Sequence, residues 1–250
     1  MTTFNKFKYL TLFTCVLLMA FNMPVKKIKV YLVGDSTMSV KLVSKYPETG
    51  WGMPFANFFD ESVSVDNRAQ NGRSTKSFIT EGRWKSVTDS LKAGDYVFIQ
   101  FGHNDEVKTK KTYTTEEEFK TNLEKYVSES LKAGAFPILI TPVARRSFDV
   151  DGNVKESHQV YSEIVRNVAK DKQVSLIDLD KESMVLLQQM GTENSKLLFN
   201  KLTPGQHPNY PAGVDDNTHF NEYGARRMAE LVLLELKKLN LELANRIVKR

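Results

Sequence analysis

The stretch IKVYLVGDSTM, residues 28–38, starts as a run of apolar and β-branched residues and ends abruptly in Gly34, Asp35, Ser36 and Thr37. A short, nearly continuous apolar run that ends at a glycine is typical of a strand covered on both faces. The residues that follow such a strand lie at one edge of its sheet. Ser36 is therefore either an ordinary turn residue or a reactive group presented at that edge.

Similar apolar runs recur along the chain at residues 95–102, 136–143 and 174–180, with a weaker one at residues 62–69. Helical patterns lie between them. The clearest is at residues 114–134, with a threonine start, an acidic first turn and a terminal glycine. Others cover residues 156–172 and 221–250, the last with Asn221 as its expected cap. This alternation predicts an α/β fold whose central parallel sheet has about five strands, with helices on both faces.

The N-terminus is typical of a secretory signal. Lys6 and Lys8 precede an apolar run at residues 9–21, which is shorter than the roughly 20 residues that span a bilayer. We therefore expect a signal peptide at residues 1–22 and a single domain at residues 23–250. The domain is expected to be exported to the periplasm or the extracellular space, without stable membrane insertion. Tethering through an uncleaved leader is the alternative.

The composition is that of a globular protein, with 41% hydrophobic and 26% charged residues. The 35 Lys and Arg residues exceed the 30 Asp and Glu residues by only 5, and they are scattered along the chain. This weak, dispersed charge argues against a nucleic-acid partner. The only cysteine, Cys15, lies in the leader, so the mature domain is expected to have no disulfide, thiol nucleophile or cysteine-bound metal.

Polar residues and glycines follow three of the predicted strands. Ser36 follows the first strand, the segment NRAQNGRS at residues 67–74 follows the second, and GHND at residues 102–105 follows the third. The carboxyl ends of parallel strands share one edge of a sheet, where the ligand site of an α/β fold is expected. These three segments should therefore converge there.

A serine nucleophile needs a base to take its proton and a third group to orient that base. Of the four histidines, His158 lies in a helical pattern that favours a structural role. His219 follows Asp216 by three residues, so the carboxylate can reach one ring nitrogen while the other faces the serine. Taken alone, Asp216 and Asn217 are more typical of a turn before a helix than of a catalytic pair.

Acyl transfer also requires hydrogen-bond donors aimed at the developing oxyanion. Gly72 can bring its backbone N–H close to a substrate, Asn104 supplies a side-chain amide, and the N–H of Ser36 is a third candidate. Each of these residues also has an ordinary role in a turn or loop. Their occurrence together with Asp216 and His219 is what favours catalysis.

Four motifs, GDST at 34–37, the block around Gly72, GHND at 102–105 and DNTH at 216–219, together resemble those of the SGNH, or GDSL-type, hydrolases. The resemblance covers residues 28 to about 240. It implies a three-layer α/β/α, flavodoxin-like fold, and it implies an esterase that uses no metal or other cofactor.

The same resemblance implies a role for each matching residue. Ser36 is the nucleophile, His219 the general base and acid, and Asp216 the residue that orients His219. The N–H groups of Ser36 and Gly72 and the side chain of Asn104 form the oxyanion hole.

A narrower resemblance, to the branch of rhamnogalacturonan acetylesterases, is carried by GDSTM, by TGWG at residues 49–52 and by the stretch at residues 202–220. Thr37 departs from the broad GDSL pattern but agrees with this branch. This narrower resemblance implies an acetylated polysaccharide substrate, above all pectic rhamnogalacturonan, from which O-acetyl groups are removed.

Several residues are candidates for substrate binding. Trp51 and Tyr210 lie in Gly- and Pro-rich segments and are candidates for stacking on a sugar, with core packing as the alternative for Trp51. Residues 202–219 hold three prolines and two glycines and are predicted to form no regular element. His207, within this stretch, is a candidate to face the cleft, with a structural role as the favoured interpretation. Arg73 is a candidate partner of a uronate carboxylate. For the pair Arg145 and Arg146 a solvated surface position is the favoured interpretation.

Three other functions remain open. A lysophospholipase or thioesterase uses the same four blocks. A metal-dependent phosphoesterase is disfavoured, because only four histidines are present. A non-catalytic carbohydrate-binding protein is disfavoured by the intact set of catalytic candidates.

Overall fold

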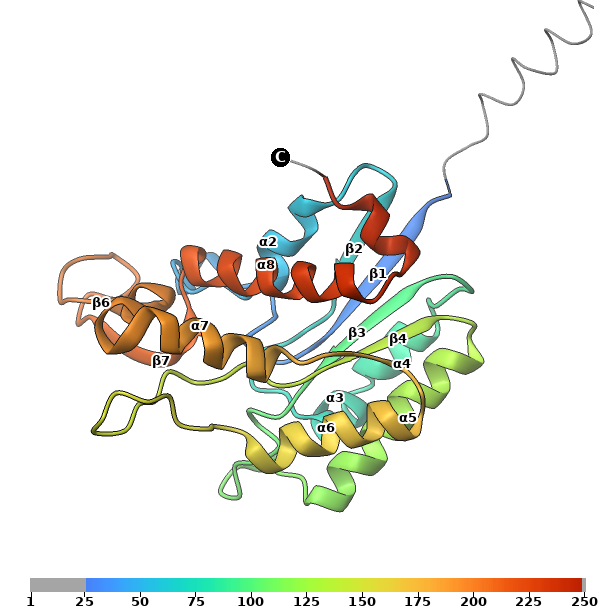
Figure 1. The fold of residues 1–250 in the computed structure, drawn as a ribbon, viewed down its shortest axis with the longest axis horizontal. Coiled ribbons are helices and arrows are strands. Elements are labelled where there is room, and N and C mark those ends of the chain that lie inside the picture. Colours follow the sequence, from blue (N-terminus) through green and yellow to red (C-terminus); the bar gives the residue numbers. More distant parts are fainter. Residues whose placement is uncertain (1–25, 249–250) are drawn as a thin grey trace, which may run out of the picture.

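All five apolar runs form strands of one parallel sheet in the computed structural model, which describes residues 26–248 (Figure 1). The strands lie in the order β2-β1-β3-β4-β5. Their bounds are Ile28–Gly34 for β1, Val63–Asn67 for β2, Tyr96–Gln100 for β3, Phe136–Ile140 for β4 and Ser175–Ile177 for β5. This is the strand order of flavodoxin-like folds, and the predicted fold class is confirmed. The predicted leader lies outside the described residues.

Helices cover both faces of this sheet (Figure 1). One layer holds α3 (Thr75–Thr80), α4 (Arg83–Thr88), α5 (Glu116–Lys132) and α6 (Gln159–Asp171), and the other holds α2 (Gly52–Phe55), α7 (Leu179–Asn194) and α8 (Glu222–Lys238). Short 3₁₀ turns lie at Val43–Lys45, Ala56–Phe58, Ser195–Leu198 and Glu242–Arg246. Within residues 26–248, no helix has the length and apolar character needed to cross a membrane.

The helix ends follow local sequence signals. Thr115 caps α5, because its hydroxyl accepts the N–H of Glu118 and the Glu118 carboxylate accepts the N–H of Thr115. Asn221 caps α8 by accepting the N–H of Gly224 at 3.0 Å. The helix predicted over residues 221–250 ends early, at Lys238, because Asn240 adopts a left-handed conformation with φ of 53°.

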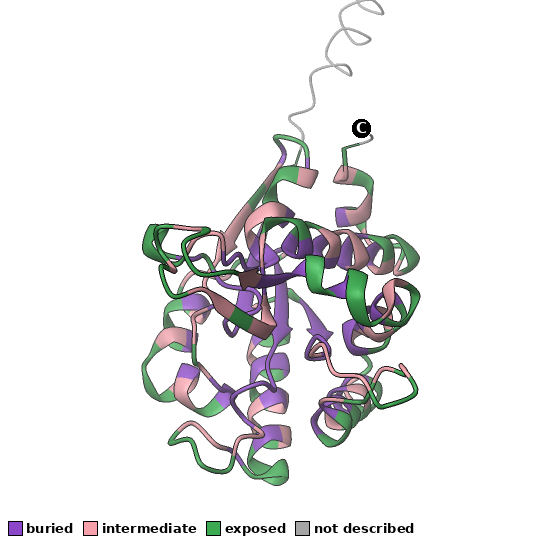
Figure 2. Ribbon diagram, turned by 90° about the vertical axis from the view of Figure 1, so that its left-hand side faces the viewer, coloured by how far each residue is buried: buried purple, intermediate pink, exposed green. Residues whose placement is uncertain are grey.

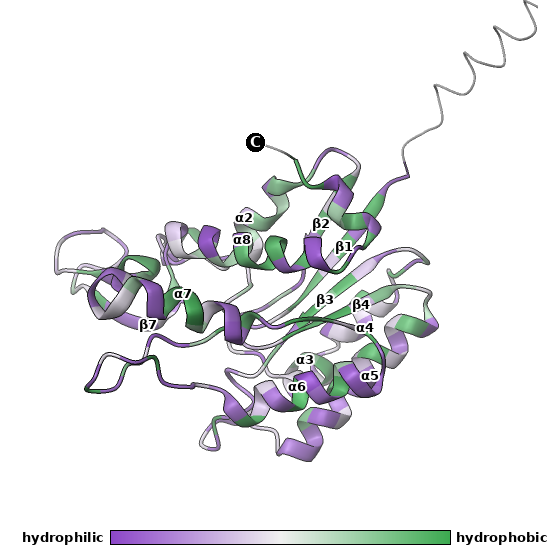
Figure 3. Ribbon diagram, in the orientation of Figure 1, coloured by the Kyte–Doolittle hydropathy of each residue, from purple (hydrophilic) through white to green (hydrophobic). Residues whose placement is uncertain are grey.

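The sheet separates two hydrophobic cores. Successive side chains of β1 point to opposite faces, so Val30 and Leu32 enter the core under α2 and α8 while Tyr31 and Val33 enter the core under α3 to α6. Figure 2 shows the buried strands between helices whose outer faces are exposed. Figure 3 shows apolar residues on the strands and polar residues on the outer faces of the helices. The sheet is therefore a rigid support for the loops at its edge.

The carboxyl ends of the central strands bring three loops together. Leu32 pairs with Asn67 on β2, and Gly34 pairs with Gln100 on β3. The backbone contact continues beyond the strands, because the N–H of Gln70 donates to the carbonyl of Gly34 at 3.0 Å. The segments after β1, β2 and β3 therefore meet at one edge.

A two-stranded antiparallel ribbon corrects one prediction. β6 (Phe199–Leu202) pairs with β7 (Val214–Phe220), although residues 202–219 were predicted to form no regular element. All three prolines and both glycines lie in the connection 203–213, so the residues after it are free to pair. Asp216 and His219 consequently lie on a strand and not in a turn.

Candidate active site

The turn after β1 is held in shape by its own side chains. The carboxylate of Asp35 accepts both the N–H and the hydroxyl of Thr37, each at 2.9 Å. Thr37 therefore has a structural reason to stand at this position, because it donates two hydrogen bonds to Oδ1 of a fully buried carboxylate. The Oδ2 atom of Asp35 has no hydrogen-bond partner among the described residues. Burial raises the pKa of Asp35, and these two hydrogen bonds oppose the rise. Ser36, between the two residues, is 8% exposed.

Ser36, His219 and Asp216 form a continuous hydrogen-bonded chain. The Nε2 atom of His219 lies 2.9 Å from the Ser36 Oγ, and its Nδ1 atom lies 2.7 Å from Oδ2 of Asp216. The other oxygen of Asp216 accepts the backbone N–H groups of Thr218 and His219, at 2.6 and 2.9 Å. A carboxylate held in this way fixes both the orientation and the tautomer of the imidazole.

The Asp216 carboxyl is strongly biased towards its ionised form. Burial alone would raise its pKa, but the hydrogen bonds and the charge of His219 outweigh burial and lower the pKa to about 2. Asp216 is therefore a carboxylate throughout the neutral pH range. Its negative charge favours an imidazolium at His219 once that ring has accepted a proton.

The three predicted oxyanion donors lie in the loops that meet at this edge of the sheet. Within residues 26–248, neither the N–H of Ser36 nor that of Gly72 has a hydrogen-bond acceptor. Gly72 has a φ of 76°, which favours glycine, and a Cβ atom at this position would meet no other atom within 4 Å. The Asn104 side chain donates to the carbonyl of Arg73 at 3.0 Å, which ties it to the residue after Gly72.

Lys41 links the Ser36 turn to the Gly72 turn. Its side chain is buried, and its Nζ atom donates to the carbonyl of Ser36 at 2.5 Å, to Oδ1 of Asn71 at 2.9 Å and to the Glu48 carboxylate at 2.7 Å. Burial lowers the pKa of Lys41, and Glu48 opposes that shift. Ser36 and Gly72 are therefore held together by a buried ion pair that no sequence motif indicated.

The TGWG segment joins the Ser36 turn to the His219 strand. The N–H of Trp51 donates to the carbonyl of Thr37 at 2.9 Å, and the N–H of Thr49 donates at 2.8 Å to the carbonyl of Phe220, which follows His219. A Cβ atom on Gly50 would lie 2.1 Å from the carbonyl oxygen of Ser39, so only glycine fits there. This motif therefore fixes the distance between serine and histidine.

The comparisons with known proteins agree with this geometry. The GDSL-like lipase/acylhydrolase family matches residues 32–227 of the chain. The chain belongs to this family. It is 40% identical to rhamnogalacturonan acetylesterase RhgT of Bacillus subtilis, over 90% of this chain and 96% of the relative. It is 35% identical to the probable rhamnogalacturonan acetylesterase YesY of the same organism, over 88% of this chain and 97% of the relative.

A solved structure shows the same fold. The crystal structure of YxiM from Bacillus subtilis superposes with a TM-score of 0.75 at 26% identity, covering 89% of this chain and 59% of the YxiM chain. YxiM is thus the longer protein, and this chain matches about three fifths of it. The chain is an esterase of the GDSL-like family and a homologue of the rhamnogalacturonan acetylesterases.

Trp51 is not a stacking surface for a sugar, which corrects that prediction. Its side chain is fully buried, packs edge-on against Phe55 and donates its indole N–H to Oε1 of Gln100 at 2.8 Å. Because the indole N–H has an acceptor in the core, burial of Trp51 leaves no hydrogen-bond donor of its side chain unsatisfied. The alternative of core packing is the one observed.

The other predicted substrate residues each make a polar contact within the chain. Arg73 is paired with Glu81 at 3.0 Å, a carboxylate that also pairs with Arg83 at 2.7 Å. His207 accepts the N–H of Asn209 at 3.2 Å and shapes the turn of the connection 203–213. The hydroxyl of Tyr210 donates to the carbonyl of Lys45 at 2.9 Å. Tyr210 therefore attaches this connection to the segment that follows the Ser36 turn.

Arg145 and Arg146 are half-buried and contact β7, which corrects the prediction that they are solvated surface side chains. Arg145 donates to the hydroxyl of Thr218 at 2.9 Å and pairs with Glu106 at 3.3 Å. Arg146 donates to the side-chain oxygen of Asn217 at 2.9 Å. Both arginines thereby hold the residues between Asp216 and His219.

The remaining histidines lie behind the site. His103 and His158 are buried with their ring centres 4.3 Å apart, and Nδ1 of His158 contacts Glu106 at 2.9 Å. Burial and the neighbouring His158 and Arg145 lower the pKa of His103 well below its usual value. Within residues 26–248, no group of three His, Cys, Asp or Glu residues is arranged to hold a metal ion.

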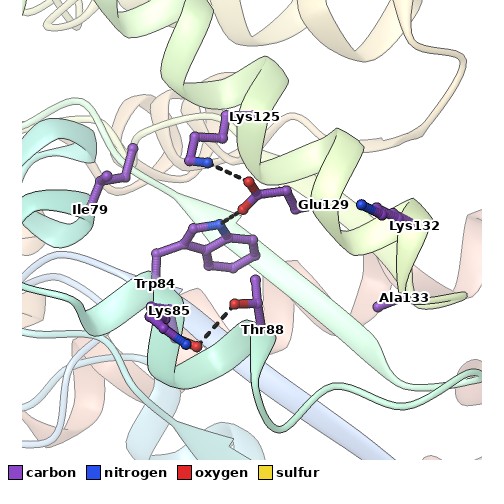
Figure 4. Close-up of a pocket in the computed structure, with 8 residues that line it drawn as sticks. All are labelled: Ile79, Trp84, Lys85, Thr88, Lys125, Glu129, Lys132 and Ala133. Atoms are coloured by element: carbon purple, nitrogen blue, oxygen red, sulfur yellow. Dashed lines mark hydrogen bonds and ion pairs between the residues drawn. The ribbon is translucent and has the colours of Figure 1, made fainter.

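A cavity of about 510 Å³ between α4 and α5 lies away from this site (Figure 4). Its walls include Trp84, whose indole N–H donates to Glu129 at 2.5 Å, and Lys125, which pairs with the same carboxylate. Lys132 and Ala133, at the end of α5, also line it and precede β4. The cavity therefore lies towards the amino edge of the sheet, opposite Ser36.

Proposed function

We propose that the protein removes O-acetyl groups from acetylated rhamnogalacturonan by a serine acyl-enzyme mechanism. The hydrogen-bonded chain from Asp216 through His219 to Ser36 is the observation that carries this proposal. A base within hydrogen-bond reach of the hydroxyl, itself oriented by a carboxylate, is what an unactivated serine requires in order to attack an ester.

The reaction has two halves. The Ser36 Oγ forms a bond to the acetyl carbonyl carbon as His219 Nε2 takes its proton. The N–H groups of Ser36 and Gly72 and the Asn104 amide stabilise the oxyanion. The bond between the acetyl carbon and the sugar oxygen then breaks, and His219 gives its proton to that oxygen, which leaves as a hydroxyl. Water attacks the acetyl-serine with the same base, which releases acetate and restores Ser36.

The relatives support the proposed substrate class. Two relatives that align with at least 88% of the chain are named for rhamnogalacturonan acetylesterase activity, one of them as probable. Thr37 and the TGWG segment, which brace the Ser36 turn, also belong to two of the three segments that resemble this branch. Both observations support a pectic substrate.

Acetate release from acetylated rhamnogalacturonan, acetylxylan and acetylated homogalacturonan tests this proposal. We expect the highest kcat/KM on rhamnogalacturonan. Ser36→Ala should abolish release, while Ser44→Ala, at an exposed serine nearby, should leave it unchanged. Equal activity of Ser36→Ala and wild type removes Ser36 from the mechanism. A preference for octanoyl or palmitoyl esters over acetyl esters contradicts the deacetylase assignment.

We also propose that the protein is exported. Lys6 and Lys8 followed by the apolar run at residues 9–21 support this proposal. Expression of the full chain and of a variant without residues 1–22, followed by fractionation, tests it. Export is expected only with the leader, and retention of the full chain in the cytoplasm contradicts the proposal. Recovery in the membrane fraction instead identifies the leader as a tether.

A further inference from the structure

The Asn104 side chain is held at both ends. Its Nδ2 atom donates to the carbonyl of Arg73 at 3.0 Å, and its Oδ1 atom accepts from the Nζ atom of Lys110 at 2.9 Å. Reversing the amide would place its oxygen against a carbonyl and its NH₂ against an ammonium group. The two contacts therefore allow one orientation only. In this orientation one N–H of Nδ2 is used by Arg73 and the second remains for a substrate.

Lys110 reaches Asn104 from an ordered loop. The residue is exposed, and turns hold its backbone, because its N–H donates to the carbonyl of Val107 at 2.9 Å and its own carbonyl accepts the N–H of Tyr113 at 3.1 Å. The loop then returns to Asp105, whose carbonyl accepts the N–H of Thr114 at 3.0 Å. These hydrogen bonds fix the backbone from which the Lys110 side chain extends towards Asn104.

The charge of Lys110 is not balanced by a carboxylate in the part of the chain that the structure describes. Two other cations near the site are paired, Arg73 with Glu81 and Arg145 with Glu106. No Asp or Glu within residues 26–248 pairs with Lys110. Among the described residues, the Asn104 oxygen is therefore the hydrogen-bond acceptor of the Lys110 ammonium group.

A cation on the oxygen of an amide changes what its N–H groups can do. A charge-assisted hydrogen bond draws electron density from the amide nitrogen towards the oxygen, which makes the remaining N–H a stronger donor. The same contact prevents the amide from rotating. Both effects matter most when negative charge develops on a bound carbonyl oxygen, which occurs in the transition state and not in the bound ester.

We propose that Lys110 is a positioning residue of the oxyanion site, which orients and polarises the Asn104 amide. This proposal rests on the proposed role of Asn104 as an oxyanion donor. It predicts that loss of Lys110 lowers kcat without weakening substrate binding.

The test uses an aryl acetate, which has no sugar and no charge for Lys110 to contact. Lys110→Met should lower kcat about tenfold with KM nearly unchanged, the size expected for one charge-assisted hydrogen bond. Lys110→Arg should restore most of the rate. Lys111→Met, at the next exposed lysine of the same loop, should behave as wild type. Urea unfolding midpoints of all three variants should match wild type.

A double variant separates this proposal from the one on which it rests. In an Asn104→Ala background, Lys110→Met should cause no further loss, because the residue it acts through is absent. A full tenfold loss in that background, or wild-type kcat for Lys110→Met alone, overturns the role of Lys110 and leaves that of Asn104 intact. Wild-type kcat for Asn104→Ala alone overturns both.

Discussion

The ammonium nitrogen of Lys41 lies 2.5 Å from the carbonyl oxygen of Ser36, beneath the candidate nucleophile. The same nitrogen contacts Asn71, which precedes Gly72, and it forms an ion pair with Glu48. A buried ion pair contributes little net stability compared with apolar residues, but removing one partner leaves the other charge uncompensated. The pair therefore sets the geometry between two parts of the site more than it adds stability.

We expect Lys41→Met to destabilise the fold by about 3–5 kcal/mol, since the buried Glu48 carboxylate loses its cation. Urea unfolding measures this loss. The double variant Lys41→Met, Glu48→Gln should recover part of it, because the unpaired charge is gone. Lys45→Met, at an exposed lysine of the same segment, serves as the control. A loss below about 1 kcal/mol for Lys41→Met contradicts the assignment of a buried pair.

Asp105, the residue after Asn104, gives the protein a pH-dependent stability. Its Oδ1 atom accepts the N–H and the hydroxyl of Thr75, at 2.9 and 2.6 Å, and the hydroxyl of Thr114 at 3.0 Å. Burial outweighs these contacts and raises the pKa of Asp105 from 3.8 to about 7. The folded chain therefore keeps this proton over a pH range in which the unfolded chain has lost it.

The free energy of unfolding should consequently fall as the pH rises from about 4 to about 7, and the Asp105 contribution should be constant above that range. A rise of about 3 pKa units corresponds to a loss of the order of 4 kcal/mol. Asp105→Asn should remove this fall, which urea unfolding at several pH values will measure. Asp151→Asn, at an exposed position, should keep it. An unchanged pH dependence in Asp105→Asn argues against the raised pKa.

The sequence predicts those parts of the molecule that depend on local pattern and on strand topology. The apolar runs specify buried strands, and the parallel order places Ser36, Gly72 and Asn104 at one edge. Lys41 and Lys110 have no such signal. Lys41 contacts Asn71 of another loop, which lies near it only after folding. Lys110 contacts Asn104 of its own loop through turns that no motif marks. The sequence did not predict strand β7, which carries His219. The prolines and glycines of residues 203–213 made the whole stretch 202–219 resemble an irregular loop.

Trp51 shows why aromatic residues in glycine-rich segments are ambiguous. Gly50 and Gly52, on either side of Trp51, allow the backbone to pass close to the residues after Ser36. This close approach places the indole in the core rather than at the surface. A sequence alone does not distinguish these two reasons for glycine. The burial of Trp51 follows from the position of the TGWG segment beneath Thr37 and Met38.

We expect Trp51→Phe to lower stability by about 1–3 kcal/mol, because Oε1 of Gln100 loses the indole N–H. KM for acetylated rhamnogalacturonan should remain that of wild type, since the side chain is not exposed to substrate. Trp84→Phe, which removes a comparable indole hydrogen bond beside the remote cavity, is the matched control. A raised KM for the polysaccharide, with KM for an aryl acetate unchanged, identifies Trp51 as a sugar contact and contradicts its burial.

The pairing of Asp216 with His219 makes the sharpest kinetic prediction. In Asp216→Asn the amide NH₂ replaces a carboxylate oxygen against Nδ1 of His219, so the imidazole carries its proton on Nε2, facing Ser36. A base in this tautomer cannot accept the serine proton, and we expect kcat to fall by about 10⁴ with little change in KM, as in other serine triads. Asp215→Asn is the control. The Asp215 carboxylate is next to Asp216 in the sequence, but it is exposed and pairs only with Lys201 among the described residues. A fall of only a few fold in Asp216→Asn means that Asp216 merely shapes β7 and that another group orients His219.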